Sequence, residues 1–407
     1  MLIAAAGNTA LQSVMPAIGR EIGISDLWVT LSYTWSAVLW VLLAPFWARQ
    51  SDLHGRKALT LMGVGGFVVA MTLCGLALLA GLKGVIAGGT TFALFAAFRT
   101  VYGALGCATP SATQAYLASK TRRSARVTAL SSLSSSFGLG TIVGPAMAPL
   151  FVLPLLGLSG PLFAFAAIGL AVFVAILAGL PDDKQPRHGP RAGHGAAMSY
   201  PGLASTPTGA SVIASTSPRM AQLSWRDPRI RRWIVAGVVA GHAQAATLAC
   251  LGFFVIDRLH LPPRGSEQSI AIVMMAGAAA TLAAQWGVIP RLKLSPRGMI
   301  LWGASIAAAG LVLTMFAAGL YAMVLGFGLA SLGFGFTRPG FTAGASLAVP
   351  LAEQGGVAGV VTAANGIAYV AAPGVGILLY TADPHWPFAL GVALLVGLVA
   401  WGRSRLA

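Results

Sequence analysis

The sequence predicts an all-α integral membrane protein, with twelve transmembrane helices in two pseudo-symmetric six-helix bundles. Its 407 residues are 57% hydrophobic, and the mean hydropathy is +0.79. Apolar stretches of about 20 residues, the length needed to cross a bilayer, recur along the chain, and one long polar segment divides them. Each stretch closes as a helix, because hydrocarbon offers no partners to backbone N–H and C=O groups.

Breaks at charges, prolines and glycines set the boundaries of the twelve spans. We expect them at residues 2–19, 28–48, 58–82, 86–118, 127–155, 159–180, 232–256, 267–290, 298–318, 321–346, 356–381 and 385–402. The first span starts at Met1 with no flanking charge, which leaves the true start of the protein open. We expect no cleaved signal peptide, because no basic segment precedes the apolar one.

The chain divides once, into an N-terminal bundle (1–180), a cytoplasmic linker (181–231) and a C-terminal bundle (232–407). The linker is polar and rich in Pro, Gly, Ser and Arg, a composition that buries too little apolar surface to fold by itself. We expect a mostly disordered tether. A regulatory or partner-binding segment is the alternative.

Two spacings repeat between the bundles. A proline follows a glycine by four residues in the fourth and tenth spans, at Pro110 and Pro339. A proline follows a glycine by seven residues in the fifth and eleventh spans, at Pro145 and Pro373. Both repeats have nearly the same offset, which indicates a duplicated unit of the kind found in transporters whose halves rock about a central site.

The distribution of positive charge predicts the orientation. Most of the 26 lysines and arginines fall in loops that share one side if both termini are cytoplasmic, whereas the outer loops hold only Arg20, Lys83, Arg258 and Arg264. The net charge of +16 therefore reflects topology and a lipid bilayer partner rather than nucleic acid. We expect a multi-pass cell membrane protein, most simply of the bacterial inner membrane.

A charged run joins the second and third spans. It contains Asp52, Gly55, Arg56 and Lys57. Gly55 permits a tight turn, Asp52 is an acceptor that can cap a neighbouring helix, and the two basic residues hold the loop at the cytoplasmic surface. The alternative is a basic loop that only sets topology.

This run resembles the GxLaDrxGRk loop signature of the major facilitator superfamily, and its Ser-Asp pair resembles the version in tetracycline and related drug exporters. Ala48 and Leu53 depart from the signature. The resemblance implies that Asp52 caps the eleventh helix at residues 355–358. It also implies that Arg56 pairs with an acid at the end of helix 4, where this chain has Ser119, so we expect a weakened latch between the bundles.

The fourth span carries Arg99, Gly103 and Gly106, which resemble the RxxxGxxG motif of the same superfamily. Arg99 stands 16 residues from Lys83 and 21 from Lys120, roughly 24 and 32 Å along a helix, which is too deep to snorkel easily. The resemblance implies a role in proton transfer or coupling. The structural alternative is that Arg99 only binds neighbouring carbonyls and locks the bundle.

The fifth span carries Gly140, Gly144 and Pro145, which resemble the GxxxGPxxGG antiporter motif of exporters in the superfamily. Ala148 and Pro149 replace its last glycines. Small residues four apart allow close helix contact, and the proline supplies a bend. Generic small-residue packing is the alternative; we favour export over import.

Other polar residues within the spans are candidates for the transport pathway, because lipid excludes them. They are Arg338, His242, Gln244, Gln114, Tyr116, Asn365 and Tyr369. We place none of the ten acidic residues at mid-membrane. A cavity with Arg99 and Arg338 therefore suits neutral, zwitterionic or anionic substrates better than organic cations.

These features predict a secondary active transporter that exports a small amphiphilic drug or metabolite by proton antiport, as in multidrug resistance. The alternatives are a facilitator or importer of a small organic anion and, in another class, a receptor or scaffold. We expect no enzyme, because no nucleophile, base or metal ligands cluster, and no ATP-driven pump, because the chain lacks GxxxxGK[ST]. We expect no metal or cofactor beyond a proton gradient, and a functional monomer.

Overall fold

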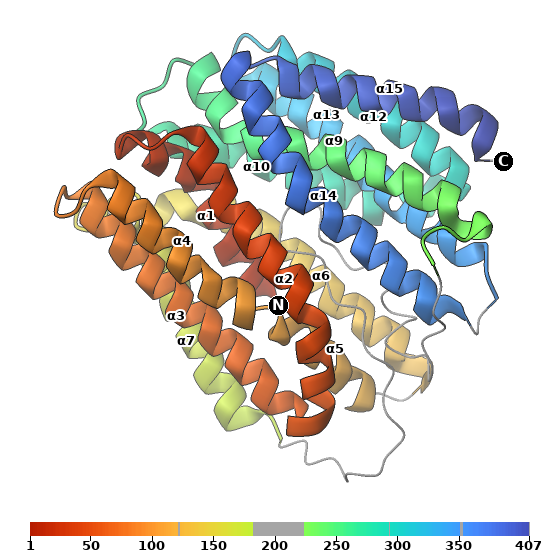
Figure 1. The fold of residues 1–407 in the computed structure, drawn as a ribbon, viewed down its shortest axis with the longest axis horizontal. Helices are drawn as coiled ribbons and strands as arrows, with labels where there is room; N and C mark the ends of the chain where they lie inside the picture. The colour runs from red at the N-terminus through yellow and green to blue at the C-terminus, as the bar shows by residue number, and fades with distance from the viewer. Residues whose placement is uncertain (121–122, 182–223, 293, 351–352, 407) are drawn as a thin grey trace.

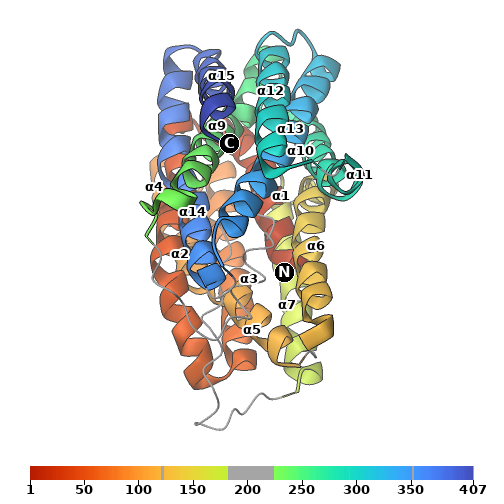
Figure 2. The ribbon, with the colours of Figure 1, turned by 90° about the vertical axis from the view of Figure 1, so that its right-hand side faces the viewer.

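The computed structural model describes residues 1–120, 123–181, 224–292, 294–350 and 353–406, and within its helices it leaves some side chains undescribed, those of 51–54 and 114 among them. Figure 1 shows two groups of helices packed against each other. Turned by 90°, the groups remain distinct, with the C-terminal helices above the N-terminal ones (Figure 2). The described regular structure is helical, apart from one isolated bridge between Leu153 and Gly157.

The N-terminal group contains the helices that precede residue 182. They are α1 (Leu2–Glu21), α2 (Asp26–His54), α3 (Arg56–Leu82), α4 (Gly88–Leu105), α5 (Ala108–Lys120), α6 (Arg123–Met147), the 3₁₀ turn η1 (Ala148–Phe151) and α7 (Gly160–Gly179).

The C-terminal group follows residue 223. It contains α9 (Pro228–Arg258), α10 (Ser266–Leu282), the π-helical η2 (Ala283–Val288), α11 (Ile289–Leu292), α12 (Pro296–Met315), α13 (Leu320–Leu347), α14 (Gln354–Ala382) and α15 (Trp386–Arg405). We call the end of the molecule where α7 finishes and α9 begins the linker end, and the other end the opposite end. The division into two bundles and a linker stays a prediction, because residues 182–223 lie outside the described part.

The helices have the apolar surface that a membrane requires. Ten helical segments of the described part are long and apolar enough to cross a bilayer. Large apolar side chains such as Trp28, Leu42 and Leu325 lie exposed on the outside of the molecule. Lipid accepts such a surface, whereas water does not. The predicted all-α membrane fold is confirmed.

Two predicted spans are not among these ten, although both are helical. The first span, α1, carries Asn8, Thr9, Gln12 and Ser13, and α6 carries a run of serines. In α1 these polar residues face the interior, where Asn8, Thr9 and Ser13 are buried. The polarity that lowers the hydropathy of α1 is thus directed at other helices and away from lipid.

Three predicted spans need correction. The span 86–118 is two helices, because Pro110 has no N–H to donate to the carbonyl of Gly106 and α4 ends at Leu105. The span 127–155 leaves α-helical geometry after Met147, where Pro149 interrupts the ladder. The span 267–290 passes through the π-helical turn η2.

The two groups meet along a few helices. α14 lies beside α2, and α10 lies beside α6 and α1. Gly252 of α9 packs closely against Pro16 of α1: a Cβ atom on Gly252 would lie 2.4 Å from the proline ring. Only glycine permits this approach, which brings the groups together near the opposite end.

Candidate functional site

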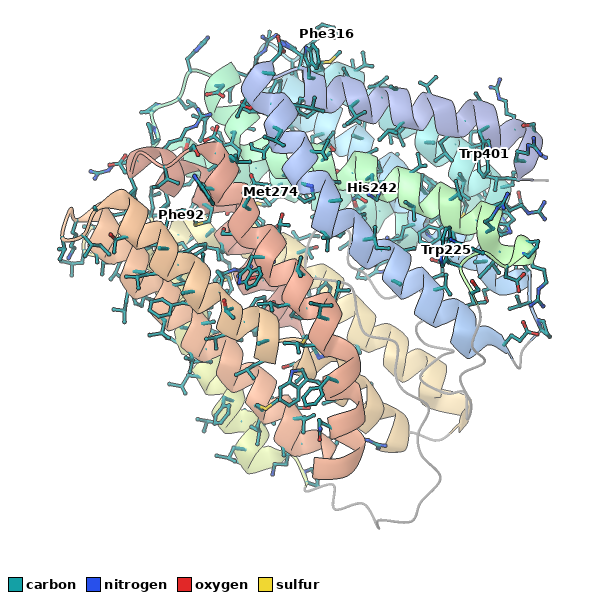
Figure 3. The ribbon with its side chains drawn as sticks, viewed as in Figure 1. Phe92, Trp225, His242, Met274, Phe316 and Trp401 are labelled. Carbon is teal, nitrogen blue, oxygen red and sulfur yellow. The ribbon has the colours of Figure 1, made fainter. Side chains whose placement is uncertain are left out.

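A cavity of about 90 Å³ lies between the two groups of helices. Met274 of α10, which lines it, lies where the groups meet (Figure 3). The lining is Gln12, Met15 and Pro16 of α1; Val29, Thr30, Tyr33, Thr34 and Ala37 of α2; Ala245, Leu248, Ala249, Leu251, Gly252 and Phe253 of α9; Met274 of α10; and Tyr369 and Pro373 of α14.

In the described part of the chain, the lining is mostly apolar, with a few polar side chains and no acidic one. This composition is typical of sites for small organic molecules. Such sites commonly measure about 300–1,000 Å³, so the cavity is smaller in this state than a drug-sized ligand needs. Among the described residues there is also no group of three or more side chains that could hold a metal ion.

Arg99 of α4 lies directly behind this cavity. Its side chain is 1% exposed, and its Nη2 donates a hydrogen bond to Asn8 Oδ1 at 3.1 Å. Its Cζ lies 5.0 Å from the ring centroids of both Tyr33 and Tyr102. Cation–π contacts in such desolvated places contribute about 2 kcal/mol. The predicted burial of Arg99 is confirmed, and because Tyr33 also lines the cavity, one ring separates the charge from the space between the groups.

A polar row on α1 connects Arg99 to the cavity, and sequence reasoning missed it. Asn8, the partner of Arg99, stands one helical turn before Gln12 and shares its face. Gln12 lines the cavity, and its amide oxygen is buried and accepts no hydrogen bond from any described residue. The four-residue spacing of Asn8 and Gln12 in an otherwise apolar span was the available signal.

Arg338 of α13 is the second buried arginine, with 9% of its surface exposed. It lies close enough to Tyr369 of α14 for an electrostatic interaction. Tyr369 lines the cavity and Arg338 does not. Each group of helices therefore has a buried arginine that interacts with a tyrosine, and both tyrosines line the same cavity.

The other predicted pathway residues are not gathered around Arg99. His242 Nδ1 donates to the carbonyl of Val238 in its own helix at 2.8 Å, and Asn365 Nδ2 donates to the carbonyl of Val361 at 3.0 Å. Neither they nor Gln244 line the cavity. His242 lies on α9 near α14 (Figure 3). Their roles stay predictions.

Tyr116 lies far from this cavity. Its hydroxyl donates to the carbonyl of Pro181 at 3.3 Å, at the linker end. The side chain of Gln114, in the same helix, lies outside the described part of the structure.

The loop motif forms the turn between α2 and α3. Gly55 has a φ of 92°, a conformation that side chains strongly disfavour, so the predicted need for glycine is confirmed. Arg56 was expected at the surface and is instead 2% exposed; α3 begins at this residue, which makes it part of a packed helix rather than of a loop. Lys57 is half-buried. Asp52 was expected to cap residues 355–358. The side chains of Asp52, of residues 355, 356 and 358 and of Ser119 lie outside the described part, so this cap and the weakened latch stay predictions.

The glycines of the fifth predicted span, Gly140 and Gly144, lie in α6 and pack it against α1. A Cβ atom on Gly140 would lie 2.4 Å from the carbonyl oxygen of Leu2, and one on Gly144 would lie 2.2 Å from the carbonyl oxygen of Ala6. Pro145 lies inside α6. These contacts are within the N-terminal group, so they account for the glycines by close packing; a role in antiport remains a prediction.

Gly144→Val is therefore expected to destabilise the protein. The added side chain has no room against Ala6 and Thr9, and overpacking of this kind costs about 1–3 kcal/mol. The thermal transition in detergent should fall by several degrees. Gly328→Val is the matched control, because Gly328 also lies within a helix but has nothing within 4 Å of its Cβ position. Equal melting of the two variants would contradict the packing described.

A network of polar and charged side chains joins the groups at the opposite end; the sequence had indicated only Arg20, as a charge of an outer loop. Arg20 of α1 donates to the Asp26 carboxylate of α2 at 2.7 Å and to the Asp257 carboxylate of α9 at 2.9 Å. A second Arg20–Asp257 bond is present, and Tyr380 of α14 donates to Asp257. We call Arg20, Asp26, Asp257 and Tyr380 the opposite-end network.

The opposite-end network lies next to the cavity. Arg20 Cζ lies 5.6 Å from the ring centroid of Phe253, which lines the cavity. A second cross-group pair, Glu21 with Arg264 at 2.8 Å, lies further out, and the Arg264 side chain is 73% exposed. Together these bonds tie α1 and α2 to α9 and α14 on this side of the cavity.

Comparisons with known proteins agree with this architecture. The sequence is 27% identical over 177 residues to the multidrug resistance protein MdtG of Proteus mirabilis (strain HI4320), and 28% identical over 174 residues to MdtG of Yersinia enterocolitica serotype O:8 / biotype 1B. Each alignment covers 42% of this chain and 40% or 39% of the relative. In these matches the chain thus spans about two fifths of the length of the curated relatives.

Solved structures show the same fold. The human organic anion transporter MFSD10 (TETRAN) matches with a TM-score of 0.64 at 17% identity, over 98% of this chain and 96% of that one. A bacterial homologue of the iron transporter ferroportin matches at 17% identity, with a TM-score of 0.67 in its inward-facing state (99% of this chain, 97% of that one) and 0.59 in its outward-facing state (100% and 97%).

The family follows from the sequence model and the fold together. The model described as Major Facilitator Superfamily matches residues 1–294, which is most of the chain. The match includes the motifs of the α2–α3 loop and of the fourth and fifth predicted spans. The helices it covers, and those beyond it, take the same arrangement as solved transporters. The chain belongs to the major facilitator superfamily and is a multi-pass membrane transporter.

Proposed function

We propose that the protein exports a small amphiphilic drug or metabolite in exchange for protons, by alternating access between the bundles 1–180 and 232–407. In this proposal the membrane is a bacterial inner membrane, and the linker end and both termini are cytoplasmic. The observation that carries it is the cavity between the groups of helices, with the buried charge of Arg99 one aromatic ring away.

Ion pairs that join the two groups at the opposite end support alternating access. Arg20 bonds to Asp257 across the groups, and Glu21 bonds to Arg264. In Figure 1, helices of the two groups such as α3 and α15 slope differently and diverge toward the linker end. The cavity is also small for an organic ligand, so substrate binding requires the groups to move. We take this state to be closed toward the outside.

The substrate class follows from the lining. Apolar side chains such as Met15, Leu248 and Phe253 suit the apolar part of an amphiphile, and Gln12 offers an amide to a polar part. Arg99 and Arg338 are buried positive charges that interact with lining tyrosines, and no acidic side chain of the described residues lines the cavity. Neutral, zwitterionic and anionic amphiphiles are therefore favoured over organic cations. The name of the MdtG relatives supports a drug-like substrate.

The buried arginines also favour a second candidate, a facilitator or importer of a small organic anion. A guanidinium in a desolvated site attracts a carboxylate or phosphate strongly and bidentately. The organic anion transporter among the structural neighbours supports this candidate. It differs from the first in needing no proton gradient. A receptor or scaffold, the third class, would transport nothing.

Transport by purified protein in liposomes separates these candidates. The panel comprises one neutral, one anionic and one cationic amphiphilic dye of similar size, each with and without an imposed pH gradient. We expect accumulation of the neutral or anionic dye against its gradient, lost on adding a protonophore. Equilibration of the anion without any gradient would establish the facilitator instead. Movement of no dye would contradict transport of this substrate class.

A further inference from the structure

A second binding site lies at the linker end of the C-terminal group. There the first turn of α9 and the last turns of α15 border a groove with a volume of about 940 Å³. Arg231 and Arg232 of α9 and Arg405 of α15 line it, together with Trp225 and Trp401. Figure 3 shows the two tryptophans at this same end of the group, near the C-terminus. The groove is remote from the cavity between the groups and shares no residue with it.

The groove has an excess of positive charge. No described carboxylate pairs with Arg231, Arg232 or Arg405; Arg232 donates only to the backbone carbonyl of Arg405, at 3.5 Å. The acids nearby are already bound, because Asp227 and Glu353 both accept from Arg229, at 2.8 and 2.7 Å. The hydrogen bonds from Arg229 lower the pKa of Asp227, which keeps that pair ionised. Three guanidinium groups therefore border one groove, and no carboxylate of the described residues neutralises them.

The groove also has an apolar side. Trp225 and Val235 expose 55% and 37% of their surfaces, and Val235 lies two turns into a helix that crosses the membrane. Tryptophan is enriched where lipid headgroups meet the hydrocarbon, and its ring packs well against the glycerol and upper acyl carbons. A free anion would use the arginines and leave this apolar surface without a partner. A ligand with a charged head and an apolar tail uses both.

We propose that this groove, lined by Arg231, Arg232, Arg405, Trp225 and Trp401, binds the headgroup of an anionic phospholipid. The guanidinium groups donate to the phosphodiester oxygens, in the geometry that arginine forms with phosphate. The acyl chains run along Val235 and Trp401 into the membrane. Basic pockets between transmembrane helices commonly hold such headgroups. Because α9 begins here and α15 ends here, the lipid joins the first and last helices of the C-terminal group.

The test compares lipid binding to the full-length protein and to Arg231→Gln/Arg405→Gln. Purified protein is titrated with phosphatidylglycerol in phosphatidylcholine nanodiscs. Native mass spectrometry counts the bound lipid, and the thermal transition measures the stabilisation that the lipid gives. We expect wild type to retain phosphatidylglycerol in preference to phosphatidylcholine, and the double variant to bind it at least tenfold more weakly. Arg291→Gln/Lys293→Gln removes the same charge from the segment that precedes α12 and should bind as wild type does.

Three results would overturn the proposal. The double variant could bind phosphatidylglycerol as tightly as wild type, or the control could lose it equally, which would make the effect one of net charge. Inorganic phosphate alone could displace the lipid and give the same stabilisation, which would make this a site for free anions. Both replaced arginines are exposed, so folding should survive; Arg231→Gln alone repeats the comparison with one change.

Discussion

Replacing Arg99 by alanine is expected to abolish transport while the protein still inserts in the membrane. The change removes the buried charge that lies behind Tyr33 and the N–H group that donates a hydrogen bond to Asn8. Transport by Arg99→Ala should fall to the level of empty liposomes. The measurement is initial uptake of the transported dye per inserted protein, with the amount of protein read from the membrane fraction.

Two further variants distinguish a functional from a purely structural arginine. Asn8→Ala removes the hydrogen bond to Arg99 and keeps the charge, so it should lower transport only partly. Arg99→Lys keeps the charge but lacks the planar group that faces two tyrosines, and should recover part of the activity. If Arg99→Ala transports normally, or if it fails only because it melts or does not insert, the proposed role at the cavity is wrong.

Replacing Asp257 by asparagine is expected to open the opposite end of the transporter. Asp257 accepts hydrogen bonds from Arg20 and Tyr380 and holds α9 to α1. Breaking a buried ion pair costs about 3–5 kcal/mol. Here the Arg20 and Asp257 side chains are 24% and 37% exposed, so we expect about 1–2 kcal/mol. This is roughly a five- to thirty-fold shift in population toward the outwardly open form.

The distance between two spin labels measures this shift in population. Val85→Cys and Tyr321→Cys place labels on exposed positions of the two groups at the opposite end, after replacement of the three buried native cysteines. The distance distribution should move to longer values in Asp257→Asn. Glu21→Gln is the matched control, because it also breaks a cross-group pair, but one whose arginine is largely exposed; such pairs contribute about 0–1 kcal/mol. Equal shifts in both variants would contradict the special role of Asp257.

The fold could be predicted from the sequence because bilayer physics leaves few choices. Apolar length, charge asymmetry and the loop motif each lead to the same helical membrane architecture. The errors came from backbone chemistry within spans. Pro110 divides one predicted helix and Pro149 ends another, because hydropathy averages over residues whose missing N–H groups act locally.

The site was predicted only in part. Arg99 and Arg338 stood out because a charge deep in an apolar span is costly, and the structure buries both. The four-residue spacing of Asn8 and Gln12 places them on one face of a helix, but nothing in the sequence shows that this face meets Arg99 or that Tyr33 lies beside it. The opposite-end network was out of reach, because Arg20 and Asp257 are far apart in sequence and meet only when the two groups pack. His242 and Tyr116 attracted attention by residue type, yet their hydrogen bonds go to backbone carbonyls outside the cavity.

Two distances measured on the same protein show whether the two groups of helices alternate in opening at the linker end and at the opposite end. One label pair is Val85 with Tyr321 at the opposite end; the other is Leu177 of α7 with Leu347 of α13 at the linker end, both exposed positions. Going from wild type to Asp257→Asn, we predict that the first distance lengthens while the second shortens. If both distances change in the same direction, or the linker-end distance does not change when the opposite end opens, the two groups do not rock about the cavity. Alternating access is then wrong.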